Sequence, residues 1–358
     1  MLNDSLRLIV FNNCKELGEK VNRHINIMRG TDINYIVPIA ETRFNNGEGK
    51  VVIKETVREK DVYILSDIGN YSCTYEMFGF KNHMGPDEHF QDIKRVISAM
   101  EGHTSSITVI TPLLYAARQH KRKGRESLDC AIALQELEAL GVKEIITFDA
   151  HDPNVQNAVP CLPFENFYPT NYILKDFMKN EKVDLKELIV VSPDTGAMDR
   201  TRYYADILKC DVGMFYKRRD LSKVVDGKNP IVAHEYMGTK ITDKDVIIVD
   251  DMISSGDSML EVAYKLKRKK AKNVYIITTF ALFTNGIDKY EKAYKKGIFK
   301  KVYSTNLTYT SNILKQKEWF RIVDCSMQLA EIIDTINKKQ SISPLLDTKR
   351  EIMELLKQ

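Results

Sequence analysis

The sequence has no apolar run that approaches the roughly 18 residues needed to cross a bilayer. Its first residues, MLNDSLRLIVFNNCKELGEK, lack a basic stretch followed by an apolar stretch, so we expect no secretory signal peptide. These two absences argue against a membrane-spanning or secreted protein. We expect a cytoplasmic protein with no membrane partner.

Paired cysteines and a large excess of charge are also missing. The six cysteines include no CxxC pair, so we expect neither a disulfide framework nor a zinc site. The net charge of +4 is slight for 358 residues and gives no reason to expect a nucleic-acid partner. A chain of this length is too long for one compact core and suits two domains.

Short β-branched runs alternate with helical patterns from about Ile107 onward. Such strand–helix–strand units imply mostly parallel sheets with helices on both faces, which makes the fold class α/β. The pattern predicts strands at Ile107–Ile110, Glu144–Phe148, Leu188–Val191, Val212–Tyr216, Val246–Val249 and Asn273–Phe280, and helices at Ser127–Leu140, through Tyr203–Leu208 and from Met259.

Two sheets of this kind fit the length, with a division somewhere near Val159–Tyr168. We expect an N-terminal domain over residues 1–160, a C-terminal domain over residues 161–340 and a C-terminal helix over residues 341–358. The polar segment Asp67–Ser105 breaks the rhythm, apart from one clear helix that starts near Pro86. The sequence assigns that segment no function.

The stretch VIIVDDMISSGDSML, residues 246–260, carries the clearest chemistry. Its apolar start predicts a buried central strand, which places Asp250 and Asp251 at the carboxyl edge of a sheet, where ligands bind in α/β folds. Gly256 lets the backbone approach a ligand, and Ser258 with Glu261 forms a capping-box pattern that predicts the next helix start. Backbone N–H groups at such a start favour a phosphate.

Two carboxylates beside a phosphate cradle can hydrogen-bond sugar hydroxyls or hold a hydrated Mg²⁺. The stretch therefore predicts a sugar-phosphate site. The alternative is an ordinary strand–turn–helix connection whose acids merely cap the helix.

The same stretch resembles the phosphoribosyl pyrophosphate-binding loop shared by phosphoribosyltransferases and ribose-phosphate pyrophosphokinases. Five further segments resemble the pyrophosphokinases, in collinear order between about residue 40 and residue 345. They are FNNGE from Phe44, ARQ from Ala117, FDAHDP from Phe148, VVSPDTGAMDR from Val190 and FYKRRD from Phe215. The resemblance implies two similar phosphoribosyltransferase-like domains.

It also implies a reaction, the transfer of the β,γ-diphosphoryl group of Mg·ATP to the 1-hydroxyl of ribose 5-phosphate. By the resemblance, Mg²⁺ is held by His151 and Asp194, and the transition state is stabilised by Lys217 and Arg219 on a mobile loop. The segment Asp220–Lys240 that follows has no strong apolar periodicity, which predicts a loop that closes over the site. Ribose 5-phosphate is bound by Asp250, Asp251, Ser254, Ser255, Gly256, Asp257 and Ser258. ATP is bound by Arg118 and Gln119, and by Phe44, Asn46 and Glu48 from a neighbouring subunit. The partner implied is thus a second copy of the chain, in a dimer at least and a hexamer by family resemblance.

The chemistry of the residues agrees with these roles. Diphosphoryl transfer requires positioning and positive charge around phosphorus rather than a nucleophilic side chain. Arginine matches phosphate with two parallel hydrogen bonds. Each residue also has an ordinary interpretation: His151 as a loop histidine, Asp194 as a turn residue, and the basic run at Lys217 as a solvated surface cluster.

Four features depart from the family pattern. Ser254 stands where a third aspartate is usual, and Asp257 places a negative charge beside the phosphate loop. His120 and Lys123 replace acids after the ARQ segment, and Asn46 replaces an aspartate at the adenine. Two other functions stay open: a phosphoribosyltransferase, which needs the phosphosugar loop alone, and a non-catalytic homologue that regulates an active pyrophosphokinase.

Overall fold

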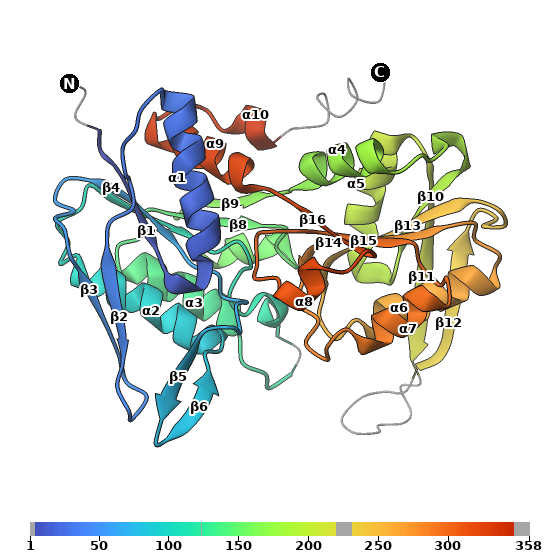
Figure 1. The fold of residues 1–358 in the computed structure, drawn as a ribbon, viewed down its shortest axis with the longest axis horizontal. Coiled ribbons are helices and arrows are strands. Elements are labelled where there is room, and N and C mark those ends of the chain that lie inside the picture. Colours follow the sequence, from blue (N-terminus) through green and yellow to red (C-terminus); the bar gives the residue numbers. More distant parts are fainter. Residues whose placement is uncertain (1–3, 123, 220–230, 347–358) are drawn as a thin grey trace. The chain divides into compact units, whose positions relative to one another are not determined.

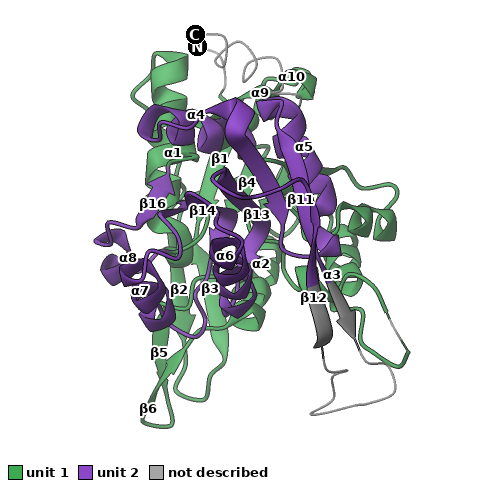
Figure 2. Cartoon of the chain, turned by 90° about the vertical axis from the view of Figure 1, so that its right-hand side faces the viewer, with its two compact units in different colours: residues 1–169, 306–309, 324–347 green, residues 170–305, 310–323, 348–358 purple. Residues whose placement is uncertain are grey.

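The computed structural model describes residues 4–122, 124–219 and 231–346, with the backbone alone for residues 217–219 and 231–234 (Figure 1). The chain divides into two compact units, coloured in Figure 2. Unit 1 comprises Met1–Pro169, Asn306–Tyr309 and Asp324–Asp347, and unit 2 is built from Thr170–Thr305 and Thr310–Val323. Among the described residues, no helix has the length and apolar character to span a bilayer.

Unit 1 contains a five-stranded parallel sheet in the order β1-β4-β7-β8-β9. The strands are β1 (Leu6–Val10), β4 (Asp61–Leu65), β7 (Ser106–Ile110), β8 (Glu144–Phe148) and β9 (Phe164–Phe167). Helices α1 (Lys15–Arg29) and α9 (Ser326–Asn337) lie on one face, and α2 (Pro86–Ala99) and α3 (Asp129–Ala139) lie on the other (Figure 1). The predicted α/β class is confirmed for this unit.

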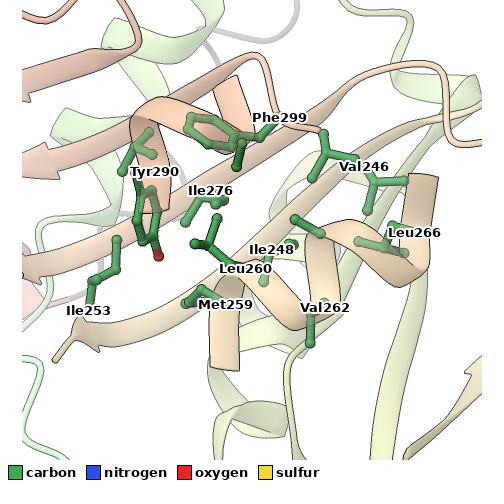
Figure 3. Packing of buried hydrophobic residues seen from close by; sticks show 14 of the residues in the cluster. Val246, Ile248, Ile253, Met259, Leu260, Val262, Leu266, Ile276, Tyr290 and Phe299 are labelled. Atoms are coloured by element: carbon green, nitrogen blue, oxygen red, sulfur yellow. The ribbon is translucent and has the colours of Figure 1, made fainter. Parts of the chain in front are cut away.

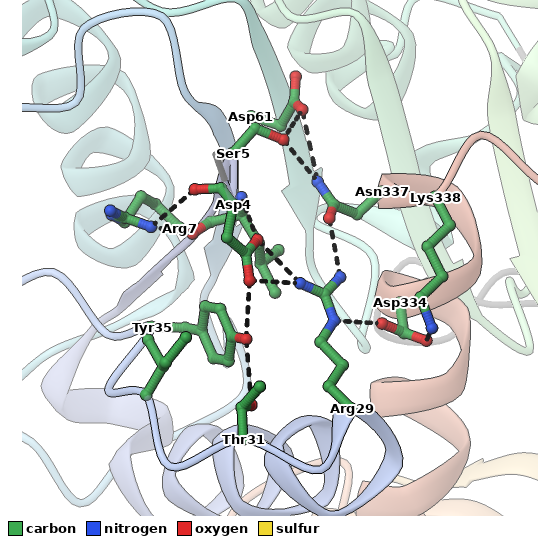
Figure 4. Close-up of polar contacts among 12 residues, drawn as sticks. Asp4, Ser5, Arg7, Arg29, Thr31, Tyr35, Asp61, Asp334, Asn337 and Lys338 are labelled. Atoms are coloured by element: carbon green, nitrogen blue, oxygen red, sulfur yellow. Dashed lines mark hydrogen bonds and ion pairs between the residues drawn. The ribbon is translucent and has the colours of Figure 1, made fainter. Parts of the chain in front are cut away.

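The sheet of unit 1 extends beyond the predicted boundary at residue 160, because β9 pairs with β8. The chain also returns to unit 1 near its end, where α9 packs against α1. Figure 4 shows the polar contacts that join these two helices to the start of β1. The Arg29 guanidinium donates to both oxygens of Asp4 at 2.9 Å and to Asp334 at 2.6 Å, and Tyr35 donates to Asp4 at 2.8 Å.

Two small hairpins project from unit 1. One pairs β2 (Ile39–Arg43) with β3 (Gly49–Ile53), and the other pairs β5 (Thr74–Met77) with β6 (Phe80–His83). The second hairpin occupies part of the polar segment that broke the strand–helix rhythm. The helix predicted from Pro86 follows it as α2.

Unit 2 contains a seven-stranded sheet in the order β12-β11-β10-β13-β14-β15-β16, parallel except for the β11–β12 pair. The strands are β10 (Leu188–Ser192), β11 (Asp211–Arg219), β12 (Ile231–Gly238), β13 (Asp245–Ile253), β14 (Val274–Ala281), β15 (Lys301–Thr305) and β16 (Phe320–Val323). Helices α4 (Thr170–Asn180) and α5 (Met198–Leu208) cover one face, and α6 (Asp257–Arg268) and α7 (Asp288–Lys295) cover the other (Figure 1). Right-handed crossovers explain this arrangement, because the chain moves in opposite directions from β10 to β11 and from β13 to β14.

The core beneath β13 and α6 is apolar throughout (Figure 3). Val246 and Ile248 of the strand contact the same cluster as Met259, Val262 and Leu266 of the helix, and all five are at most 3% exposed. This packing confirms the predicted buried strand and the helix predicted from Met259. It also fixes the strand–helix connection between them.

Two local predictions need correction. The strand that was expected to end at Val249 continues to Ile253, because its ladder with β14 persists to Ala281. The expected loop over Asp220–Lys240 contains β12, which pairs antiparallel with β11 up to Arg219. Residues 220–230 lie outside the described residues. Of the expected C-terminal helix, the structure describes the short α10 (Ser343–Leu346), and residues 347–358 lie outside it.

Candidate active site

The two adjacent carboxylates lie in the carboxyl half of β13, beside β10. These two strands are parallel, but the order in which strands are added to the sheet reverses here, since β11 extends the sheet on the side of β10 and β14 on the side of β13. Such switch points are where open α/β sheets bind ligands. Asp251 is 2% exposed, whereas the Asp250 side chain is 26% exposed, so Asp250 is the more accessible of the two.

Burial and the negative charge of Asp251 raise the pKa of Asp250 well above its usual range. Arg200 of α5 opposes this shift, with its Nη1 3.7 Å from Asp250 Oδ1. The Asp251 backbone N–H also donates to Asp250 Oδ1 at 2.9 Å. The pair is therefore a partly shielded acceptor site, able to take hydrogen bonds from hydroxyl groups.

The loop after β13 turns at Gly256, which has a backbone φ of +81° and is buried. A Cβ at this position would lie 2.5 Å from the ring of Tyr290, whose hydroxyl donates to Gly256 O at 3.2 Å. Glycine is thus required twice, by the left-handed backbone and by the close approach of Tyr290. Gly256 also precedes the first turn of α6, which starts at Asp257.

The predicted capping box of Ser258 and Glu261 is wrong. Gly256 occupies the N-cap position, and no side chain makes the capping hydrogen bond. Ser258 is already the second residue of the helix, because the left-handed glycine brings the chain into the helix earlier than expected. At the start of α6 the Asp257 N–H donates to Ser255 Oγ at 3.4 Å. The positive end of the helix dipole favours an anion at this position.

Asp257 would place a negative charge beside any bound phosphate. In the structure its Oδ1 lies 2.5 Å from Lys289 Nζ of α7. The lysine offsets the carboxylate at the point where the helix dipole also favours a negative group. The departure from the family pattern is thus compensated locally.

Asp194 follows β10, next to the acids of β13. Its side chain accepts a hydrogen bond from Gly196 N at 2.9 Å and caps the short 3₁₀ helix Thr195–Ala197. Its charge contributes to the raised pKa of Asp250, so the two carboxylates share one electrostatic neighbourhood. The turn role expected for this residue is present.

In unit 1, the ARQ and FDAHDP segments meet at the carboxyl ends of β7 and β8. His120 Nε2 lies 3.1 Å from Asp152 Oδ2, and the rings of His120 and His151 have centroids 5.4 Å apart. Burial alone would raise the pKa of Asp152, but hydrogen bonds from Asn154 and the nearby His120 and Lys121 lower it.

His151, Arg118 and Gln119 are exposed along this edge. The exposed positions suit a ligand that arrives from solvent. His120, which replaces an acid after the ARQ segment, thus lies against Asp152, the residue after His151.

Phe44, Asn46 and Glu48 lie at the exposed turn of the β2–β3 hairpin. Asn46 donates its side-chain amide to the Glu48 carboxylate at 3.0 Å and accepts the Glu48 N–H at 3.1 Å. Phe44 is 47% exposed, an unusual position for a large aromatic ring. An asparagine here pairs with Glu48, where an aspartate would repel it.

Lys217 and Arg219 belong to the end of β11, and their backbones pair with β12. Their side chains lie outside the described residues. The backbone places them at the carboxyl end of a strand beside β10, which carries Asp194.

A magnesium ion requires oxygen ligands and usually retains several waters. Among the described residues, no three His, Cys, Asp or Glu side chains form a ready metal site. The carboxylates of Asp194, Asp250 and Asp251 nevertheless suit a hydrated Mg²⁺ chemically, because this ion prefers oxygen ligands. The residues present therefore fit a hydrated ion better than a fully coordinated one.

Comparison with known proteins gives two family matches along the chain. Residues 6–141 match the N-terminal domain of ribose phosphate pyrophosphokinase, and residues 173–310 match the phosphoribosyl transferase domain. The chain belongs to the ribose-phosphate pyrophosphokinase family. The resemblance seen in its motifs is confirmed, and this family member is an enzyme, as the sequence predicted.

Curated relatives match this family member over almost its full length. A ribose-phosphate pyrophosphokinase of Haemophilus influenzae is 27% identical, over 96% of this chain and 99% of the relative. Ribose-phosphate pyrophosphokinase 2 of Schizosaccharomyces pombe is 28% identical, over 96% of this chain and 98% of the relative. The crystal structure of phosphoribosylpyrophosphate synthetase from Mycobacterium smegmatis matches with a TM-score of 0.75 and 21% identity, covering 94% of this chain and 99% of that one. That likeness confirms the predicted fold of two phosphoribosyltransferase-like domains.

Two residues beside the β13–α6 connection carried no sequence signal. Arg200 lay inside a quoted motif but had no assigned role, and Lys289 lay in a lysine-rich helix with many similar neighbours. Only the three-dimensional structure brings Arg200 to Asp250 and Lys289 to Asp257.

Proposed function

We propose that the protein transfers the β,γ-diphosphoryl group of Mg·ATP to the 1-hydroxyl of ribose 5-phosphate, which gives phosphoribosyl pyrophosphate and AMP. The ribose oxygen bonds to the β-phosphorus, the bond from that phosphorus to the α–β bridging oxygen breaks, and the hydroxyl proton passes to solvent. The observation that carries this proposal is the β13–α6 connection, where two carboxylates stand beside a glycine-shaped helix start.

Ribose 5-phosphate fits this connection group by group. Its phosphate would accept hydrogen bonds from the backbone between Ser254 and Ser258, at the positive end of the α6 dipole. Its ring hydroxyls would donate to Asp250 and Asp251. Arg200 holds Asp250 from the far side and limits the repulsion between the paired acids.

ATP would be bound by the exposed edge of unit 1. Arg118 and Gln119 would contact the nucleotide, and Phe44, Asn46 and Glu48 would reach the adenine of a neighbouring subunit's ATP. The exposed Phe44 supports this last role, because a half-exposed aromatic ring on a hairpin turn is a ready stacking surface. The active form would then be a homo-oligomer, at least a dimer.

Mg²⁺ would be held by His151 and Asp194, with water completing its coordination. When bound, the ion would neutralise phosphate charge and orient the diphosphoryl group. Lys217 and Arg219 would stabilise the additional charge of the transition state. Free thiols at all six cysteines and ATP as donor suit an enzyme of the cytoplasm.

Release of AMP from ATP in the presence of ribose 5-phosphate tests the proposal. We expect AMP and phosphoribosyl pyrophosphate in equal amounts, and none with ribose in place of ribose 5-phosphate, since the cradle requires the phosphate. A phosphoribosyltransferase would instead consume phosphoribosyl pyrophosphate with a base and release diphosphate. A chain that makes no AMP alone but changes the rate of an active relative would be a regulator, and either result would overturn the proposal.

A further inference from the structure

Lys289 and Asp257 form an ion pair beside the proposed phosphate loop. Lys289 Nζ lies 2.5 Å from Asp257 Oδ1, and the two side chains are 63% and 50% exposed. An ion pair so open to solvent contributes little to stability. Asp257 is the first residue of α6, so the pair stands where a phosphate is expected. A role in binding is therefore a better explanation than a role in stability.

The helix dipoles act differently on the two charges. Lys289 is the second residue of α7, where the positive end of the α7 dipole disfavours a cation. Asp257 starts α6, where the positive end of the α6 dipole favours an anion. A phosphate at the same helix start is favoured for the same reason. The carboxylate and the phosphate therefore compete for one position, and the lysine benefits α6 rather than its own helix.

The Asp257 side chain is held by the lysine rather than by α6. Among the described residues, its carboxylate accepts a hydrogen bond from Lys289 and from no backbone N–H group. No other cation in the described parts of the chain forms an ion pair with it. Lys289 is thus the group that keeps this carboxylate from turning to the start of α6.

The connection between β14 and α7 fixes Lys289 beside the loop. Thr284 N donates to Ser254 O at 3.0 Å. Tyr290, the residue after Lys289, is 1% exposed and donates its hydroxyl to Gly256 O at 3.2 Å. Movement of α7 away from the loop would break both contacts. The backbone of Lys289 therefore has a fixed position from which its side chain reaches the loop.

We propose that Lys289 is a positioning residue for ribose 5-phosphate, which holds the Asp257 carboxylate away from the helix start that binds the phosphate. Without the lysine, the carboxylate turns to the positive end of α6 and competes with the phosphate. Lys289 acts through Asp257 and does not itself contact the sugar phosphate. The inference rests on the proposed function, because it takes ribose 5-phosphate as the ligand of the β13–α6 connection.

Titration calorimetry with ribose 5-phosphate, without ATP and in about 0.15 M salt, tests this role. At this ionic strength, exposed charges more than about 8 Å apart are largely screened from each other. We expect Lys289→Met to bind at least about fivefold more weakly than the wild type, which is the size of effect that a charge at a helix start produces. Lys289→Arg keeps the ion pair and should bind like the wild type.

Asp257→Asn removes the competing carboxylate. This variant should bind at least as tightly as the wild type, and the double variant Lys289→Met/Asp257→Asn should lie within about twofold of Asp257→Asn. A loss of equal size in both backgrounds would mean that Lys289 contacts the phosphate itself. No loss in either background would mean a surface pair without a role in binding. Both results would overturn the proposal.

Lys292→Met is the control for the charge of α7. Lys292 is exposed one turn further along the helix and forms no ion pair within the described ranges of the chain. Its replacement removes the same charge without releasing Asp257, so binding should change by less than about twofold. A loss as large as that of Lys289→Met would assign the effect to the overall charge of the helix and would contradict the proposal.

Kinetics distinguishes this inference from the proposed function. Lys289→Met should raise the KM for ribose 5-phosphate and leave kcat nearly unchanged, because the competition affects the bound substrate and the transition state alike. A wild type that binds ribose 5-phosphate but releases no AMP from ATP would overturn the proposed function and leave the calorimetric result standing. A wild type that releases AMP, with equal losses in the two backgrounds, would overturn the role of Lys289 alone.

Discussion

Gly256 is the residue at which backbone, packing and ligand requirements coincide. Its φ of +81° and its contact with the Tyr290 ring both exclude a side chain. We predict that Gly256→Ala lowers the affinity for ribose 5-phosphate at least about tenfold, because the loop must move away from Tyr290 and the helix start moves with it. Calorimetric titration with ribose 5-phosphate measures the loss.

Gly297 offers the control for this substitution. It also has a positive φ, +65°, but a Cβ there would meet nothing within 4 Å. Gly297→Ala therefore carries the same kind of backbone strain without the clash. Equal effects of the two substitutions on binding would mean that the loop shape at Gly256 is irrelevant to the ligand.

The sequence predicted single residues well where their conformation depends on neighbours in the chain. It predicted them poorly where the contact partner lies far away in the sequence. A glycine between serines and an acid already indicated a tight turn, yet the sequence placed the cap at Ser258 and the first helical residue at Met259, rather than at Gly256 and Asp257. Propensity favours serine as a cap, but the left-handed glycine and its contact with Tyr290 overrode that preference. Lys289 could not have been predicted, because its pairing with Asp257 depends on how α7 packs beside α6.

At the scale of elements, β11 carries the residues expected to act in catalysis. We predict that Lys217→Ala and Arg219→Ala each lower kcat at least about a hundredfold, with a much smaller change in the KM for ribose 5-phosphate. The reason is that the two side chains stabilise the charge of the transition state rather than the bound substrate. The double variant should lose less than the product of the two losses. Steady-state kinetics of AMP release measures all three.

Arg218→Ala is the internal control, and we expect a small effect. The register of β11 with β12 shifts between Arg218 and Arg219, so the strand is irregular at this point. Three mild and similar variants would indicate a solvated basic cluster instead of a catalytic one.

Helices α1 and α9 depend on Arg29. Its guanidinium bonds Asp4 and Asp334, and its side chain is 10% exposed (Figure 4). We predict that Arg29→Met lowers the free energy of unfolding by about 3–5 kcal/mol, since two carboxylates lose their shared cation. The exposed Arg23 of α1 is the control, and Arg23→Met should change the free energy of unfolding by less than about 0.5 kcal/mol. Urea denaturation of both variants, followed by circular dichroism, gives the comparison.

The strands and helices predicted from Ile107 onward could be read from the sequence because apolar runs and helical periodicity mark a buried strand and a covering helix. Many other elements were not predicted, among them β1, β4, β9, β15 and β16 of the two sheets. The β11–β12 ladder holds charged residues in a strand, and the β5–β6 hairpin has little apolar pattern, with Phe78 and Phe80 exposed at 75% and 74%. The return of α9 to unit 1 depends on a contact between distant segments, which periodicity does not report.

At the scale of the whole molecule, buried carboxylates make stability depend on pH. Asp67 is 2% exposed, and burial raises its pKa to about 7, although hydrogen bonds from Tyr309, Thr308 and Gly69 lower it in part. A carboxyl group with a folded pKa above its unfolded value stabilises the fold most below the unfolded pKa. That contribution is lost as the pH rises through the folded pKa.

We therefore predict that the free energy of unfolding falls by about 4 kcal/mol from Asp67 between pH 4 and pH 7, the equivalent of about three pKa units. Asp67→Asn should flatten this decline, and Asp32→Asn, at an exposed position of the same unit, should not. Urea denaturation at several pH values provides the test, and a wild-type slope retained in Asp67→Asn would assign the pH dependence to other groups.

The return of α9 to unit 1 has a consequence for biosynthesis. Arg29 leaves the ribosome early, but its partner Asp334 lies 305 residues further along the chain. At roughly 5–20 residues per second, this interval is on the order of 15–60 seconds. Throughout it, the face of α1 that α9 will cover stays open to chaperones and to other nascent chains. A slow codon stretch in the later part of the gene would lengthen that exposure and would lower the yield of folded protein without altering any residue.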